Sequence, residues 1–281
     1  MDYNSIIADT YQEYNLLWWY TIIALTVPLL LNYYLATIIC KKKRIKGFRK
    51  FSVFALLSLI SVTLVTLAYL LPYAKAEDEA LEVLKSEGTL EYTESDTYYA
   101  FRNKGSDCAL IVYPGARIDE KAYSVLAKSI AQSGIDVYVI KAPFHIALFC
   151  IKAPDKIISE NDYKQVYISG HSLGGAVASI YASGKEDKIE GIIMLASYPS
   201  KDLNGNIRFL SIYGDKDGLL DKKAYEEEKE SWPLENSEYV IKGGNHSGYA
   251  FYGKQKGDNE ADISKKEQIE ITSEQIAEFI K

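Results

Sequence analysis

The stretch QVYISGHSLGGA, residues 165–176, contains the pattern that decides the fold. Its first part, Gln165–Ser169, has the composition of a strand, whereas the residues after the final glycine pair favour a helix. Ser172 lies in the turn between them, with Gly170 and Gly174 two positions to either side. Such a turn, a nucleophile elbow, strains its central residue, and small neighbours avoid the resulting clashes. The pattern predicts Ser172 as a nucleophile; the alternative is a glycine-rich turn with a solvated serine.

Strand and helix patterns alternate around this turn. Strands are predicted at Thr89–Glu94, Tyr98–Arg102, Cys108–Tyr113, Ile135–Lys141, Gln165–Ser169, Gly191–Ser197, Arg208–Tyr213 and Glu238–Ile241, the first two as an antiparallel hairpin. Helical patterns separate most of the later strands, and the last helix is expected to begin with a capping box at Thr272 and Gln275. The alternation predicts an α/β fold, with a mostly parallel sheet and helices on both faces. Only Lys201–Asn206 separate Ser200 from the next strand, so no cap domain is expected.

A nucleophilic serine needs a base, and the chain has three histidines. His171 is the sequence neighbour of Ser172, and adjacent side chains in such a turn point apart. His145 precedes the serine, whereas the α/β-hydrolase arrangement has the chain order serine, acid, histidine. That order predicts His246, directly after the last strand, as the base.

The acid is expected in the loop after Arg208–Tyr213, because sheets of this kind place their sites at the C-terminal ends of the strands. The loop contains Asp215 and Asp217, and Asp221 lies further along. Asp217 is the first choice, Asp215 the second and Asp221 the third. Asp215 is expected to bind nearby backbone N–H groups instead.

Two backbone N–H groups are needed to hold the oxyanion that forms on an acyl substrate. Leu173, directly after the nucleophile, is expected to supply one, and Ala116, after the strand Cys108–Tyr113, is expected to supply the other. Without a cap domain, the site is expected to be open and to favour short-chain acyl esters in solution. Its rim is predicted to consist of Phe144, His145 and the aromatic residues Tyr249, Phe251 and Tyr252.

Several further motifs together give a family resemblance. They are Tyr113-Pro114-Gly115-Ala116 with Ala122-Tyr123 downstream, Lys141-Ala142-Pro143-Phe144, the elbow, Ala196-Ser197-Tyr198-Pro199, Gly214-x-x-Asp217, Gly243-Gly244-Asn245-His246 and Tyr252-Gly253-x-Gln255-x-Gly257-Asp258. With them, the chain from Ala100 to Lys281 resembles the compact bacterial branch of the α/β-hydrolase superfamily, the fold-five branch related to dienelactone hydrolases. The resemblance implies an α/β-hydrolase fold. Dienelactone hydrolases have a cysteine nucleophile, whereas this chain has Ser172, so lactone chemistry on diene substrates is not implied.

Two upstream segments have the composition of membrane spans. Residues 16–40 and 51–73 contain no charged side chain, and each is long enough to cross roughly 30 Å of hydrocarbon as a helix. The loop between them, 41–50, has seven basic residues, and the positive-inside rule places it in the cytoplasm. The sequence therefore predicts a multi-pass protein of the cell membrane with its catalytic domain outside. Pro28 and Asn32, in the first span, would be costly on a lipid-facing surface unless the second helix covers them.

The predicted organisation has six parts. They are an extracytoplasmic tail (1–15), a transmembrane helix (16–40), a basic cytoplasmic loop (41–50), a second transmembrane helix (51–73), a linker (74–88) and an α/β-hydrolase domain (89–281). Two alternatives remain open. The segment up to Ala76 also imitates a cleaved signal peptide, and a reversed topology would put the catalytic domain in the cytoplasm.

Charge and ligand spacing exclude several function classes. The net charge is -6 although the first 73 residues are net basic, so the remainder is acidic and is expected to repel nucleic acid. No CxxC pair and no histidine pair has metal-ligand spacing, so no metal and no cofactor are expected. Asp258, Glu260 and Asp262 have the spacing of a calcium loop, but Ile263 occupies the place of the required glycine.

The sequence predicts a membrane-anchored, carboxylesterase-like serine hydrolase. Its substrate is expected to be a small acyl ester, cleaved by Ser172, His246 and Asp217 through an acyl-enzyme, and its spans are expected to bind the lipid bilayer. One alternative is a catalytically silent hydrolase fold that serves as a membrane-tethered binding domain. Another is an acyltransferase or peptidase on the same scaffold.

Overall fold

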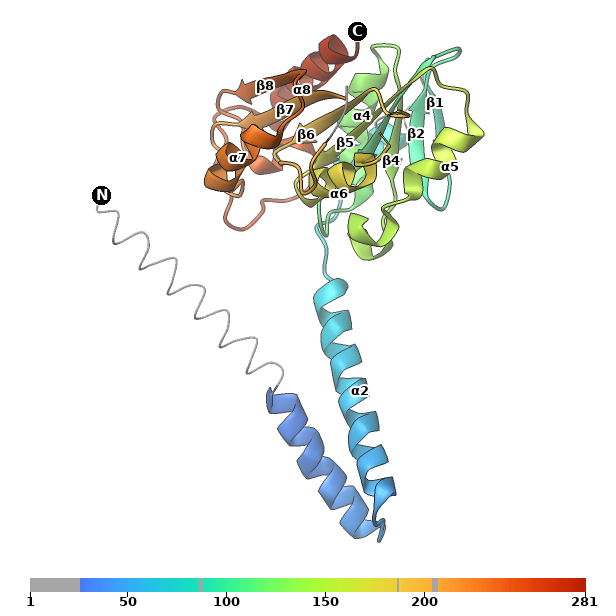
Figure 1. The fold of residues 1–281 in the computed structure, drawn as a ribbon, viewed down its shortest axis with the longest axis vertical. Coiled ribbons are helices and arrows are strands. Elements are labelled where there is room, and N and C mark those ends of the chain that lie inside the picture. The colour runs from blue at the N-terminus through green and yellow to red at the C-terminus, as the bar shows by residue number, and fades with distance from the viewer. Residues whose placement is uncertain (1–25, 86–87, 186, 204–206) are drawn as a thin grey trace, which may run out of the picture. The chain divides into compact units, whose positions relative to one another are not determined.

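The computed structural model describes residues 26–85, 88–185, 187–203 and 207–281. The chain divides into two compact units, Met1–Pro72 and Tyr73–Lys281. The first contains the predicted membrane segments up to residue 72, and the second contains the predicted hydrolase domain (Figure 1).

Two helices make up most of the described part of the first unit: residues 26–42 and α2 (Phe48–Leu70). Among the described residues, Phe48–Leu67 is the one helical segment long and apolar enough to cross a membrane, by length and composition. Residues 16–25 of the first predicted span lie outside the described part. Asn32 is only 4% exposed, and its Nδ2 donates to Ser61 Oγ of α2 at 3.0 Å. The neighbouring helix therefore covers this polar side chain, as expected.

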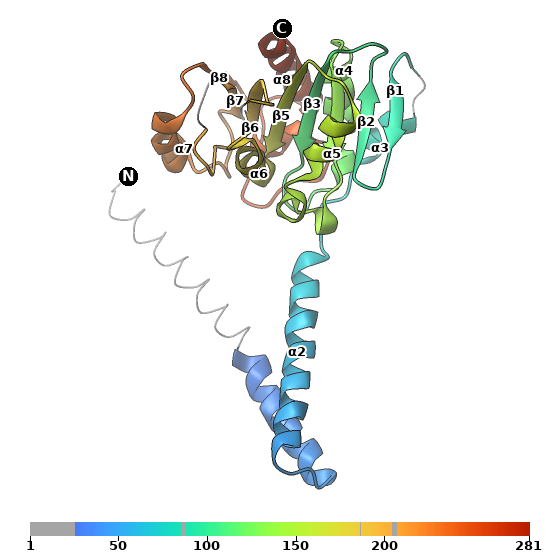
Figure 2. The same ribbon diagram turned by 45° about the vertical axis from the view of Figure 1, so that its right-hand side comes forward.

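Among the described residues of the second unit, eight strands form one sheet in the order β1-β2-β4-β3-β5-β6-β7-β8 (Figure 2). The strands are β1 (Glu91–Glu94), β2 (Tyr98–Arg102), β3 (Cys108–Tyr113), β4 (Asp136–Ile140), β5 (Gln165–His171), β6 (Gly191–Leu195), β7 (Arg208–Gly214) and β8 (Asn236–Ile241). The β1–β2 and β2–β4 pairs are antiparallel, and all other pairs are parallel. Every predicted strand is present, and the mostly parallel sheet is confirmed.

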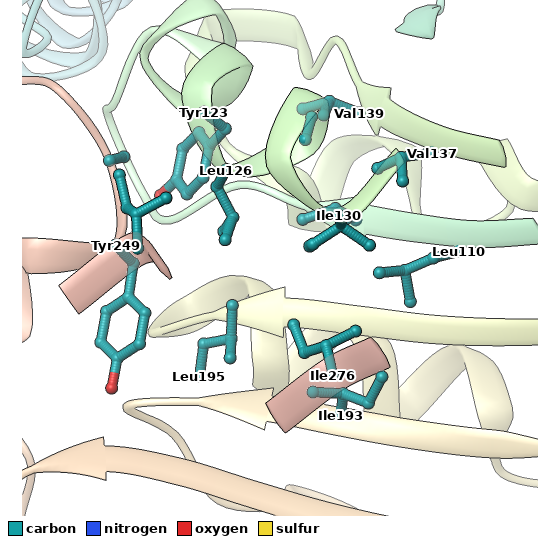
Figure 3. Packing of buried hydrophobic residues seen from close by; sticks show 14 of the residues in the cluster. Leu110, Tyr123, Leu126, Ile130, Val137, Val139, Ile193, Leu195, Tyr249 and Ile276 are labelled. Carbon is teal, nitrogen blue, oxygen red and sulfur yellow. The ribbon is translucent and has the colours of Figure 1, made fainter. Parts of the chain in front are cut away.

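Helices cover both faces of this sheet. They are α3 (Asp78–Lys85), α4 (Ser124–Ala131), α5 (Ala153–Glu160), α6 (Leu173–Ala182), α7 (Lys222–Glu228) and α8 (Lys265–Ile280), with the 3-10 turns η1 (Glu120–Tyr123), η2 (Pro143–His145), η3 (Ala147–Cys150), η4 (Lys229–Ser231) and η5 (His246–Tyr249). Leu110 of β3 belongs to one buried cluster, together with side chains of α4 and α8 (Figure 3). Its neighbour Ile111 belongs to a second buried cluster on the opposite face, together with side chains of α5 and α6. The two-residue period of the strands thus builds a core on each face.

The N-terminal border of the second unit differs from the predicted linker, 74–88. Ala74 forms a parallel bridge with Ile118 and Ala76 an antiparallel bridge with Tyr252, and α3 begins at Asp78. Ser124 of α4 donates its hydroxyl to Ala80 O of α3 at 2.6 Å. The described residues of the linker therefore pack against the hydrolase domain, because α3 is amphipathic and buries one face.

The last helix begins earlier than predicted. Ser264 caps α8, with its Oγ accepting from Glu267 N–H at 3.2 Å. Thr272 lies in the middle of the helix, where its hydroxyl donates to Gln268 O at 2.7 Å. The capping box at Thr272 was therefore a wrong prediction, because Ser264 offers an earlier cap and the buried face of the helix already includes Ile269.

Candidate active site

Ser172 occupies the junction of β5 and α6. Its backbone angles, φ 53° and ψ -125°, lie in a region that residues other than glycine rarely adopt. Ser172 N–H donates to Leu195 O at 2.9 Å, and Ser197 Oγ donates to Ser172 O at 2.8 Å. The end of β6 and the segment after it therefore hold this strained backbone in place.

Close approaches require the two glycines of the elbow. A Cβ at Gly170 would lie 2.1 Å from Gly174 O, and a Cβ at Gly174 would lie 2.4 Å from Tyr113 O. The second approach packs the first turn of α6 against the end of β3. Leu173 is the first residue of α6, so its N–H has no acceptor within the helix. The approach of Gly174 to Tyr113 O and Pro114 O brings the first turn of α6 against the segment that leads to Ala116, the other predicted oxyanion donor.

His246, in η5 directly after the loop that follows β8, pairs with Asp217 in the loop after β7. His246 Nδ1 and Asp217 Oδ2 are 2.9 Å apart, and the two residues are 3% and 4% exposed. The other carboxylate oxygen, Oδ1, accepts from the N–H groups of Leu219 and Leu220, each at 2.8 Å. An ionised carboxylate only accepts, so Nδ1 of the imidazole donates to it. His246 Nε2 is buried and has no hydrogen-bond partner among the described residues of the chain.

The other two candidate acids have different partners. Asp215 Oδ1 accepts from Gly243 N–H at 2.7 Å, the backbone contact expected of it. Asp221 caps α7, with Oδ1 accepting from the N–H groups of Lys223 and Ala224 at 3.1 Å. Of the three predicted alternatives, Asp217 is the carboxylate that contacts the predicted base.

Ser172 and His246 line the same cavity, which has a volume of about 300 Å³. The wall also includes Leu173, Ala176, Ala196, Ser197, Tyr198, Ser200, Leu219, Leu220 and Asp221. The cavity thus lies between α6, the segment after β6 and the loop after β7. The structure brings the predicted nucleophile and the predicted base to one space that accommodates a small acyl group.

The residues predicted for the rim, Phe144, His145, Tyr249, Phe251 and Tyr252, do not line this cavity. Tyr249 is fully buried, and its hydroxyl donates to Ile212 O at 3.1 Å. Phe251 is half-buried and packs against the core on one face of the sheet. The segments 196–200 and 219–221 contribute to the wall instead. The prediction did not find them because their approach to α6 depends on how the strands pair.

A hydrogen-bond chain behind the nucleophile, not found from the sequence, joins the elbow to two loops. His171 Nε2 lies 2.9 Å from His246 O, so this nitrogen donates. Burial and the neighbouring His246 lower the pKa of His171 well below its usual range, so the ring is neutral and Nδ1 accepts. Nδ1 receives the Tyr123 hydroxyl at 2.7 Å, and Tyr123 Oη accepts from Gly115 N–H at 2.8 Å. The chain therefore holds the loop of Ala116 against the elbow.

Asp258 forms a second set of contacts that the sequence did not reveal. Its Oδ1 accepts from Gly218 N–H at 3.1 Å and from His246 N–H at 3.2 Å. Its Oδ2 accepts from the N–H and the hydroxyl of Ser247, at 2.9 and 2.6 Å. Asp258 therefore ties the loop of Asp217 to the loop of His246. The only signal in the sequence was its place in the last of the family-like stretches.

The buried His171 makes the fold sensitive to acid. Its pKa is lowered by burial in the folded state, whereas a histidine in the unfolded chain has a pKa of about 6.5. Between these values the unfolded state binds one more proton, so this stability is present above about pH 6.5 and is lost as the pH falls below it. We expect the free energy of unfolding to fall by up to about 1.4 kcal/mol for each pH unit. For a folded domain of this size, the corresponding fall in Tm is roughly 3 °C.

Thermal melts followed by near-UV circular dichroism, between about pH 7.5 and about pH 5, measure this effect. The variant His171→Gln has no group that titrates at this position, so its Tm should fall less steeply than that of the wild type. Parallel Tm curves for the two proteins would contradict the assignment.

Among the residues that the structure describes, no group of three or more His, Cys, Asp or Glu side chains is placed to hold a metal ion. The acids with calcium-loop spacing have other contacts: Asp258 has those given above, Glu260 pairs with Lys254, and Asp262 pairs with Lys216.

Comparisons with known proteins identify the family and the fold. A family model described as the alpha/beta hydrolase family matches residues 109–270. An alpha/beta hydrolase enzyme from a sediment metagenome of the Mar Chica lagoon in Morocco is similar in structure, with a TM-score of 0.52 and 13% identity over 68% of this chain and 97% of that one. A comparison with curated proteins finds no match.

Two further solved structures are similar. The monoacylglycerol lipase of Paleococcus ferrophilus has a TM-score of 0.51 and 14% identity, with 67% of this chain and 99% of that chain covered. The dienelactone hydrolase of Anabaena variabilis has a TM-score of 0.51 and 12% identity, with 69% and 98% covered. At these identities the similarity concerns the fold.

Proposed function

The chain belongs to the alpha/beta hydrolase family, and from this premise we propose that it is a serine hydrolase that cleaves a small acyl ester. One observation carries the proposal. His246 has its Nδ1 held by Asp217 at 2.9 Å, while its Nε2 is buried without a hydrogen bond, and it lines the same cavity as Ser172. An unpaired buried nitrogen costs stability, and a general base needs this kind of free acceptor.

The first half of the reaction forms an acyl-enzyme. Ser172 Oγ attacks the carbonyl carbon of the ester, and His246 Nε2 takes the hydroxyl proton. Asp217, fixed by two backbone N–H groups, stabilises the imidazolium that results. The N–H groups of Leu173 and Ala116 stabilise the negative charge on the carbonyl oxygen.

The second half returns the enzyme to its starting state. The tetrahedral intermediate collapses, the C–O bond of the ester breaks, and His246 gives its proton to the leaving alkoxide. Water then attacks the acyl-enzyme while His246 takes a proton from it. The acid leaves, and Ser172 Oγ receives that proton.

The alternative of a catalytically silent binding domain is disfavoured by two features that cost stability. Ser172 has a positive φ of 53°, a conformation that costs of order 1–3 kcal/mol and tends to occur at functional sites. The second feature is the unpaired Nε2 of His246. Both features have a use in catalysis, since the turn exposes the serine and the free nitrogen can take its proton.

Purified full-length chain in detergent should hydrolyse a nitrophenyl ester and release nitrophenolate together with the free acid. If the chain is an acyltransferase, an added alcohol should instead be converted to a new ester at the expense of the acid. A peptidase should cleave nitroanilides as well as esters. Absence of ester hydrolysis, of acyl transfer to the alcohol and of nitroanilide cleavage would favour the catalytically silent binding domain.

We further propose that the chain is anchored in the cell membrane through residues 16–40 and 51–73. Leu59 and Leu64 of α2 are 64% and 61% exposed, and exposed apolar side chains along a whole helix are favourable in lipid and unfavourable in water. The hydrogen bond between Asn32 and Ser61 removes a polar group from the lipid-facing surface. With the basic loop 41–50 in the cytoplasm, the hydrolase domain lies outside.

The orientation is testable with engineered thiols in a chain whose native cysteines have been replaced. In intact cells, a membrane-impermeant maleimide should label Leu234→Cys in the hydrolase domain and should not label Ile45→Cys in the basic loop. The reverse pattern would place the hydrolase domain in the cytoplasm.

A further inference from the structure

Three exposed apolar side chains lie together on η2 and η3; we call them the apolar tip. Phe144, Leu148 and Phe149 are 47%, 44% and 57% exposed, and the two phenylalanine rings are 6.0 Å apart. A soluble surface rarely keeps adjacent large apolar groups in water, and such clusters mark sites of contact with a protein or a membrane.

The backbone holds the tip in this exposed position. Phe144 and His145 have φ values of 54° and 55°, in the left-handed region that is costly for bulky residues. His145 O accepts from Arg117 N–H at 2.6 Å, and its Nδ1 lies 3.0 Å from Glu120 Oε2. The other oxygen of Glu120 accepts from Ala142 N–H at 2.7 Å. These contacts fix the strained turn, and the fixed turn holds the Phe144 side chain exposed to solvent.

The tip lies at the C-terminal end of the parallel strands, and the candidate active site lies at the same end. β3, β4 and β5 are parallel neighbours, so their C-terminal ends lie at one edge. β5 leads into Ser172, β3 leads into the loop of Ala116, and β4 leads into the tip. A surface that contacts the tip therefore also faces the catalytic edge.

The chain enters the hydrolase unit beside the tip. Tyr73, the last residue of the proposed span 51–73, stacks on His145 with 3.8 Å between the ring centroids. The next residue, Ala74, accepts from Asp119 N–H at 2.8 Å and donates to Arg117 O at 2.7 Å. An aromatic residue at the end of a span settles at the lipid–water interface, and His145 is the sequence neighbour of Phe144.

We infer that the apolar tip inserts into the lipid surface and that the site takes its ester from the membrane. This inference rests on the proposed function and on the proposed anchor. It departs from the expectation of soluble short-chain esters, and it identifies the substrate class as acyl esters dissolved in lipid. Leu173, Leu219 and Leu220 in the cavity wall fit an acyl chain.

The contact with lipid can be measured without turnover. Full-length chains without native cysteines, each with one bimane-labelled cysteine, are reconstituted into vesicles that contain nitroxide lipids. The probe positions are Phe149→Cys at the tip, Leu59→Cys in α2 as the positive control, and Leu234→Cys as the negative control. Leu234 is fully exposed, at 102%, and lies two residues before the start of β8, so it lies at the opposite end of the parallel strands.

We expect quenching at positions 59 and 149 and none at 234. Quenching at 59 without quenching at 149 would overturn the inference but leave the anchor intact. A probe at 149 that is shielded from water without quenching would indicate a protein partner, and would also overturn it. Absence of quenching at 59 would instead refute the anchor, and with it this inference.

The substrate class is tested with a double variant of the tip, Leu148→Ser with Phe149→Ser, against the matched control Leu234→Ser. In the reconstituted full chain, the double variant should lose about tenfold in hydrolysis of a long-chain ester dissolved in the bilayer. It should hydrolyse a water-soluble ester at the wild-type rate, as should the control. An equal effect on both esters, or on neither, would contradict the inference, whereas failure of the wild type on both esters would contradict the proposed function.

Discussion

Replacing Ser172 by alanine should lower kcat by about 10⁶. The loss is this large because the alanine variant has no nucleophile, and Asp217 and His246 have nothing to activate. The variant should fold as the wild type does, since the backbone contacts of Ser172 with Leu195 and Ser197 use main-chain atoms of residue 172. Steady-state hydrolysis of a nitrophenyl ester, with a thermal melt of each protein, gives the result.

Ser200 offers a matched control, because it lines the same cavity and is exposed. Its backbone N–H, which donates to Ser179 Oγ at 2.8 Å, is retained in Ser200→Ala. We expect this variant to keep activity within about tenfold of the wild type. A comparable loss in both variants, or full activity in Ser172→Ala, would be incompatible with Ser172 as the nucleophile.

The variant Asp217→Asn should lose about 10⁴ in turnover with little change in fold. Oδ1 of residue 217 accepts from two backbone N–H groups, so the asparagine would keep its oxygen there and turn its NH₂ toward His246. An NH₂ group donates, so His246 Nδ1 would have to accept and Nε2 would carry the proton. A protonated Nε2 takes no proton from Ser172. The loss should therefore appear in kcat.

The variant Asp215→Asn is the matched control, two residues away in the same loop. Its side-chain oxygen still accepts from Gly243 N–H, a contact of 2.7 Å in the wild type, so we expect a loss of less than about tenfold. Kinetics on both variants decide the assignment. Equal losses would leave the acid unassigned, and a larger loss at Asp215 would make Asp215 the acid.

The positions of Ser172 and His246 could be predicted because local and topological rules agree there. The spacing of Gly170 and Gly174 has a steric cause that is visible in the sequence, since the strained turn leaves no room for a Cβ at either position. His246 followed from the order of residues along the chain. The strands were predictable for the same kind of reason, because each buried run has a period that depends only on its own residues.

The supporting contacts could not be predicted in this way. Asp258 joins backbone groups of two loops that are far apart in the sequence. Its spacing from Glu260 is that of a calcium loop, so the local pattern indicates a different role. The hydrogen bond that the Tyr123 hydroxyl donates to His171 joins residues 48 positions apart. Such contacts follow from strand order, which short sequence patterns do not determine.

The rim and the start of the last helix differ from the prediction for a related reason. Tyr249 was expected at the mouth of the site because aromatic residues follow His246, but this side chain turns inward and its hydroxyl donates to Ile212 O. Thr272 and Gln275 have cap spacing, yet the helix already passes through them. In both cases the local pattern is compatible with two structures. Packing against the sheet selects the structure that was not predicted.

In the proposed mechanism, Ser172 is a nucleophile activated by His246. A fluorophosphonate tests it directly, because Ser172 Oγ attacks the phosphorus atom and fluoride leaves, which adds a stable mass to one peptide. We predict that mass spectrometry will find the label on Ser172, that it will persist in Ser200→Ala, and that its rate of formation will fall by at least about 10³ in His246→Ala. A wild-type protein without label on Ser172, or equal labelling in His246→Ala, would contradict the account.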